Sequence, residues 1–166
     1  MRRAGQVAIG VVVLLTVALY AGFAMCERQR YLAMIPASIE TSGSIRIGGE
    51  THFRRGCGVA VFRLSERASI LALRQGLTFF ELARQERSNT SGYPDYEPWR
   101  ETPIVERSES NAIVLGVACA SLKPSLEQQI EAAAEHPGSF FTTTTGGRRK
   151  LLVSPASRLV VLAYWE

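Results

Sequence analysis

An uncharged apolar run near the start of the chain limits what this protein can fold into. Residues 7–25 form nineteen consecutive positions without a charge, and Arg2 and Arg3 precede them. As an α-helix such a run would extend roughly 28 Å, which is close to the thickness of the hydrocarbon core of a bilayer. The sequence therefore predicts one transmembrane anchor at residues 7–25, and contact with a membrane through it.

Two kinds of cleaved leader are alternatives to an anchor. The basic start and the small residues Gly22 and Ala24 fit a signal peptide that is cut before Met25. However, the run is longer than the ~7–15 residues of most signal-peptide cores, which favours an uncleaved anchor. Cys26 follows the run as in a lipoprotein signal, but Met25 stands where such signals carry a small residue. We therefore do not expect lipidation.

The charges beside the run predict its orientation. Cytoplasmic flanks of membrane helices tend to be basic, so Arg2 and Arg3 place residues 1–6 in the cytoplasm as a short tail. Residues 26–56 then form a juxtamembrane linker, and residues 57–166 form an extracytoplasmic domain. A composition rich in Ala, Gly and Arg is typical of GC-rich bacteria. The predicted location is the inner (cytoplasmic) membrane, crossed once, with the domain in the periplasm.

The cysteines agree with this orientation. Cys57 and Cys119 both lie in apolar segments whose residues favour strands. If these segments are neighbours, an oxidising compartment allows a disulfide between them. On the chain-entropy model, a bridge that closes a loop of this length stabilises the fold by about 4 kcal/mol. Two buried thiols are the alternative, and we expect the bridge.

The remaining pattern predicts an α+β fold. Apolar, β-branched segments predict strands at residues 57–64, 111–119, 140–144, 150–153 and 158–164, with a short strand at 44–47 inside the linker. Ser65 can cap one helix, Gly76 can separate it from a second at residues 78–84, and Ser125 with Gln128 has the spacing of a capping box for another. We expect a small, mainly antiparallel sheet with two or three helices on one face.

The sequence offers little for catalysis. It contains two histidines and one aspartate, and no spacing typical of a metal site, a P-loop or a nucleophile elbow. Without Arg2 and Arg3, the surplus of basic residues falls from +4 to +2, which argues against nucleic acid as a partner. We assign no catalytic residue, metal or cofactor, and predict a non-catalytic binding or accessory domain. The alternatives are a small periplasmic hydrolase that uses His52 with a serine, and a domain that faces the cytoplasm.

Two segments are candidate binding surfaces. The first carries Tyr93, Tyr96 and Trp99 between prolines, either as an exposed recognition loop for an envelope protein or folded back as a lid on the core. The second is a predicted hairpin turn after Gly146 and Gly147, with a basic cluster that can contact anionic headgroups or be an ordinary solvated turn: Arg148, Arg149 and Lys150. The sequence does not indicate an oligomeric state.

Overall fold

The computed structural model describes residues 2–52, 55–90, 95–105 and 107–165, with side chains at 12–50, 56–90, 95–105 and 113–165. The chain divides into two units, residues 1–32 and Ala33–Glu166. Helix α1 (Arg2–Ala33) occupies the first unit and ends at the first residue of the second. Its part Val12–Ala33 is long and apolar enough to cross a membrane. This helix includes the residues of the predicted anchor.

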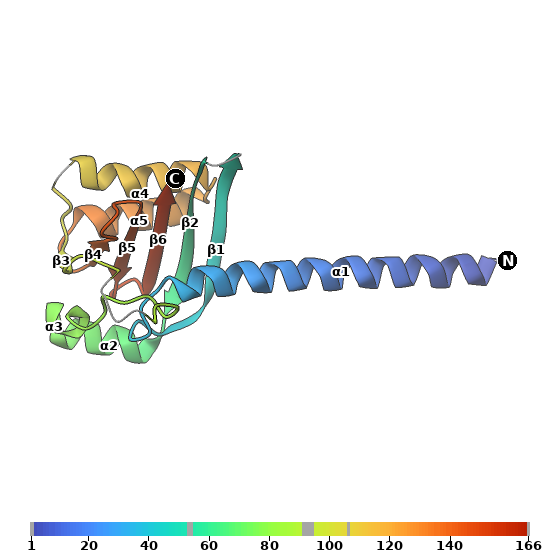
Figure 1. The fold of residues 1–166 in the computed structure, drawn as a ribbon, viewed down its shortest axis with the longest axis horizontal. Helices are drawn as coiled ribbons and strands as arrows, with labels where there is room; N and C mark the ends of the chain where they lie inside the picture. Colours follow the sequence, from blue (N-terminus) through green and yellow to red (C-terminus); the bar gives the residue numbers. More distant parts are fainter. Residues whose placement is uncertain (1, 53–54, 91–94, 106, 166) are drawn as a thin grey trace. The chain divides into compact units, whose positions relative to one another are not determined.

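The second unit is built on a six-stranded antiparallel sheet (Figure 1). In spatial order its strands are β1 (Thr41–His52), β2 (Arg55–Leu64), β6 (Leu159–Trp165), β5 (Arg149–Ser154), β4 (Phe140–Thr143) and β3 (Arg100–Glu101). The predicted α+β class and the mainly antiparallel sheet are confirmed. The hairpin between β4 and β5 is confirmed as well, and Gly147 adopts the left-handed backbone of its turn, with φ of 71°.

The prediction of a strand at residues 111–119 is wrong, because these residues belong to helix α4 (Arg107–Cys119). Ile113, Val117 and Ala120 are buried at helical spacing, whereas Val114 and Leu115 are more than half exposed. A short apolar run rich in β-branched residues fits a buried strand and a one-sided helix equally well. Here the burial pattern has the period of a helix.

Helices α4 and α5 (Pro124–Glu135) cover one face of the sheet, and lie side by side in Figure 1. They enclose a core with the strand residues Val59, Val61, Phe141, Leu152, Val161 and Ala163. The other face has a different cover. Phe80 stacks at 4.7 Å on Phe140, which alternates with Phe141 and so points to the opposite side. The predicted one-sided arrangement therefore holds for α4 and α5, but not for the helix that carries Phe80.

The remaining helices follow their predicted start and stop signals in part. Ser65 caps α2 (Glu66–Gln75) by accepting the Ala68 N–H at 3.1 Å, as predicted. After Gly76 the second helix is a single turn, α3 (Leu77–Phe80), and does not extend over residues 78–84. The predicted capping box at Ser125 is wrong, because α5 takes Lys123 as its N-cap and starts with Pro124. Proline suits this first position, since it has no N–H to satisfy.

The domain begins earlier than the sequence suggested. Residues 26–56 were expected to be a linker, but β1 pairs with β2 from Thr41 opposite Leu64 to His52 opposite Arg55. The compact unit already starts at Ala33. An edge strand needs a partner for its backbone on one side only and can remain largely polar, which explains its weak hydrophobic signal.

A close backbone contact holds α4 against the sheet. Gly116 lies so near to β2 that a Cβ atom there would stand 2.7 Å from the carbonyl oxygen of Gly58 and 3.0 Å from the Cβ of Ala163. Only glycine fits this gap, because the first of these neighbours is backbone and cannot rotate away. The helix consequently packs on the sheet at a distance that larger residues would prevent.

We expect Gly116→Ala to destabilise the protein. Alanine normally stabilises a helix interior by roughly 0.5–1 kcal/mol relative to glycine, but overpacking of this kind costs about 1–3 kcal/mol. Urea unfolding of the full chain in detergent, followed by circular dichroism, should therefore give a net loss. Gly146→Ala is the matched control, since its Cβ would meet no atom within 4 Å. Equal stability of the two variants would contradict the proposed contact.

Candidate functional site

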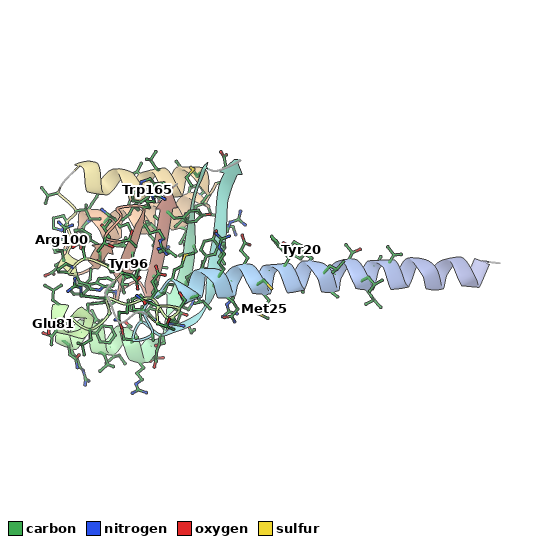
Figure 2. All side chains as sticks on the ribbon, viewed as in Figure 1. Tyr20, Met25, Glu81, Tyr96, Arg100 and Trp165 are labelled. Carbon is green, nitrogen blue, oxygen red and sulfur yellow. A yellow bond between two sulfur atoms is a disulfide. The ribbon has the colours of Figure 1, made fainter. Side chains whose placement is uncertain are left out.

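The aromatic segment predicted as a recognition loop is folded against the domain. Tyr96 is fully buried, and its hydroxyl donates to the carbonyl oxygen of Met34 at 2.6 Å. Trp99 is 8% exposed, and its Nε1 donates to the carbonyl oxygen of Ala83 at 2.7 Å. Figure 2 shows Tyr96 surrounded by other side chains. The structure thus has the lid arrangement for these two rings, while Tyr93 lies outside the described residues.

A polar network next to Tyr96 fixes this segment further. Asp95 Oδ2 accepts the Glu86 N–H at 2.8 Å and Asn89 Nδ2 at 2.6 Å. Glu86 Oε1 in turn accepts Arg149 Nη1 at 2.5 Å. Burial raises the pKa of Glu86, Asp95 adds to this, and Arg149 opposes it. Burial also raises the pKa of Tyr96, so its hydroxyl acts as a donor at any physiological pH.

The three residues of the predicted basic cluster in the hairpin differ in burial and in their contacts. Arg148 is exposed. Arg149 forms the ion pair with Glu86. Lys150 is 1% exposed, and its Nζ lies 5.4 Å from the centre of the Phe141 ring. Of the three side chains, only Arg148 stands free of the domain, so contact of this cluster with headgroups stays a prediction.

The expected disulfide is present between Cys57 and Cys119. It joins β2 to the last residue of α4 across 62 residues of sequence, with a Cα–Cα distance of 5.8 Å. Cys119 thus reaches its partner from a helix and not from the neighbouring strand that the sequence suggested. Cys26 is a free and exposed thiol.

The described residues do not assemble a metal site or a histidine-based site. His136 is exposed at the carboxyl end of α5, with Nδ1 3.1 Å from the carbonyl oxygen of Ala132. The side chain of His52 lies outside the described ones, so the hydrolase alternative has no geometry here. Within the described ranges, no three His, Cys, Asp or Glu residues come close enough to hold a metal ion.

The structure contains a cavity that sequence analysis did not find. It has a volume of about 510 Å³ and lies where β1, β2 and the β5–β6 turn meet the start of α5. Four cationic side chains line it together with serines and a glutamine, and we call it the basic cleft: Arg46, Arg63, Lys123, Arg158, Ser121, Ser125, Ser157 and Gln129. Its apolar walls are Ile45, Leu126 and Leu159.

Local backbone features bring these residues together. A bulge between Ser44 and Arg46 disturbs the regular pairing of β1. Ser121 and Arg158 have positive φ angles of 47° and 54°, and they are the non-glycine residues for which the described part of the chain shows this conformation. Both line the basic cleft. Such strained positions gather at functional sites, where the surrounding structure holds them in place.

The Arg158 side chain is positioned by the strand beside it. Its Nε donates to the carbonyl oxygen of Leu64 at 3.3 Å. Arg63, one residue earlier on β2, pairs with Leu159 across the ladder. The two guanidinium groups are thus brought to the same end of the sheet by residues 95 positions apart in sequence.

No local signal in the sequence marks the basic cleft. Its cations come from a strand, its neighbour, a turn and a helix cap, and no two of them are closer than seventeen residues. Comparisons of the chain with protein-family models, with curated proteins and with solved structures gave no match. The geometry of the molecule therefore carries the functional argument alone.

We expect Tyr96→Phe to destabilise the domain without changing its fold. The change removes one hydroxyl and leaves the partly buried carbonyl of Met34 without this donor, at a cost of about 1 kcal/mol. Urea unfolding of the full chain in detergent measures it. Thr145→Val serves as the control, because Thr145 is exposed and uses only its backbone N–H in the hydrogen bonds recorded for it. A Tyr96→Phe variant as stable as the wild type would contradict a contribution of this hydrogen bond to stability.

The raised pKa of Glu86 predicts a pH dependence. A carboxyl group whose pKa is higher in the folded state favours folding below its unfolded pKa, and this contribution is lost as the pH rises through the folded value. The stability of the wild type minus that of Glu86→Gln should therefore be smaller at pH 7 than at pH 4. Unfolding by urea at both pH values tests this. Gln85→Ala is the control, because Gln85 is a neighbouring exposed residue without a titrating group. The stability of the wild type minus that of this variant should be the same at pH 4 and pH 7.

Proposed function

We propose that this protein is a non-catalytic binding domain anchored in the inner membrane by residues 7–25, with residues 33–166 on the extracytoplasmic side. The helix that contains the anchor is 32 residues long and continues beyond the apolar run. It therefore has the length to cross a bilayer and to lead into the domain.

The disulfide carries the assignment to an oxidising side. Reducing systems keep cytoplasmic thiols reduced, whereas secreted and periplasmic domains form stable disulfide bridges. Cys57 and Cys119 lie at a Cα–Cα distance of 5.8 Å, within the usual range for a bridge, and tie α4 to the sheet. A domain with this bridge is suited to an extracytoplasmic location, which favours this side over a cytoplasmic one.

The lining of the basic cleft supports binding over catalysis. General acid–base chemistry most often uses histidine or a carboxylate with a pKa near the working pH. The described residues that line the cleft include four cations, three serines and a glutamine, and neither a histidine, a cysteine nor a carboxylate. Such a surface supplies positive charge and hydrogen-bond donors, which suits recognition of an anionic partner.

Labelling in intact cells tests the proposed topology. In a Cys26→Ser background, Gly146→Cys places one free thiol in an exposed turn where its Cβ meets no atom within 4 Å. We expect a membrane-impermeant maleimide to label this variant in intact cells. The Cys26→Ser parent should stay unlabelled until a reductant opens the Cys57–Cys119 bridge. The mass of the purified protein should also include residues 1–24.

Labelling of Gly146→Cys only after the cells are permeabilised would overturn the extracytoplasmic placement. A mature protein that starts at Met25 would overturn the anchor and replace it with a cleaved signal peptide. The two results are independent of each other, since a cleaved leader also exports the domain.

A further inference from the structure

We infer that the basic cleft binds a phosphate-bearing anion, either a soluble phosphate ester or diphosphate or the phosphate headgroup of a lipid. This inference rests on the proposed binding function and names the chemistry of the ligand. It is carried by a cavity that four cations line and whose described lining contains no carboxylate.

The first argument is the charge. Arg46, Arg63, Lys123 and Arg158 line one cavity, and no described carboxylate lines it with them. These side chains are hydrogen-bond donors only, so they cannot satisfy one another. Like charges gathered in one cavity also raise the free energy of the empty site. An anion with more than one negative charge offsets this repulsion and takes the place of the water that solvates the exposed donors.

The second argument is the preparation of the donors. The hydrogen bond from Arg158 Nε to the Leu64 carbonyl fixes the guanidinium, whose Nη groups then remain as a fork for an anion. The left-handed backbone at Arg158 sets the direction in which this side chain leaves the turn. A site whose donor is already oriented loses less conformational entropy when the ligand binds.

The start of α5 adds to the same site. Lys123 is the N-cap of this twelve-residue helix, and no side chain caps the first turn. Ser125, in that turn, lines the cleft. The amino end of a helix carries a partial positive charge, which favours an anion. This contribution reinforces the four cations and does not define the site by itself.

The third argument is the kind of anion. A phosphate group offers several acceptor oxygens and up to two negative charges, and it matches the planar fork of arginine. A simple carboxylate carries one negative charge and would balance only one of the four cations. The cavity of about 510 Å³ is also larger than an inorganic phosphate needs, and Ile45, Leu126 and Leu159 supply apolar walls. The ligand should therefore carry an organic body beside its phosphate.

The test uses the full chain in nanodiscs of phosphatidylcholine, a lipid without net charge. Inorganic pyrophosphate probes the soluble source, and dihexanoyl phosphatidic acid below its micelle concentration probes the lipid source, both by isothermal titration. We expect saturable binding of at least one of the two. Arg46→Gln with Arg63→Gln should weaken it by about tenfold or more, because hydrogen bonds to charged groups contribute at least this much. Both arginines are exposed, so the domain should keep its unfolding temperature.

The matched control is Arg67→Gln with Arg74→Gln, which removes the same charge from exposed positions on α2 outside the cleft. Binding lost in the cleft variant but kept in the control supports the site, and the probe that binds identifies the source. Absence of binding of both probes, or equal weakening in both variants, would overturn the inference. The topology of the chain is measured separately, so this failure is distinguishable from a failure of the proposed function.

Discussion

The packing of α4 on β2 is the constraint on which the α4–α5 side of the domain depends. Gly116 lets the helix approach until its backbone meets that of Gly58. One turn later, Cys119 is bonded to Cys57, so the carboxyl end of the helix has a fixed place above the sheet. The link to α5 starts there, and Ser121 turns it with a left-handed backbone. The first turn of α5, and with it one wall of the basic cleft, is positioned by this chain of contacts.

The opposite face of the sheet is closed in another way. Residues 81–90 and 95–99 on this side form no helix or extended strand, and aromatic side chains and polar groups hold them in place. The Phe80 and Trp99 rings stack at 4.6 Å, and Tyr96 reaches the carbonyl of Met34 with its hydroxyl. The ion pair of Glu86 with Arg149 ties the same segment to β5. A long loop rich in proline is often mobile or functional. Here its hydrogen bonds to the rest of the domain give it a structural role, so the basic cleft is the better candidate for a binding site.

Elements with local signals could be predicted from the sequence, and elements defined by distant partners could not. Ser65 marks the start of α2 because its side chain caps a neighbouring N–H, and β2, β5 and β6 each contain a run of consecutive buried apolar residues. Helix α4 lacks an amphipathic pattern strong enough to outweigh its β-branched residues. Strand β1 forms through backbone pairing with β2. Polar and glycine residues permit this pairing, but their pattern in the sequence does not predict a strand. The disulfide was predicted correctly although the element that carries Cys119 was not, because pairing depends on proximity and not on secondary structure.

The positive charge of the domain is unevenly distributed and is highest at the basic cleft. From residue 27 onward the chain has a surplus of only +2, yet the cleft alone contains four cations, so the other charged residues of this part sum to −2. The positive potential is consequently concentrated in one cavity and is not a property of the whole surface. At physiological ionic strength, charges are screened beyond about 8 Å, so the cleft attracts an anion electrostatically only at short range. Selection then depends on how well its oxygens fit the guanidinium groups, of which that of Arg158 is held by the Leu64 carbonyl, and a weak overall charge is compatible with a specific anion site.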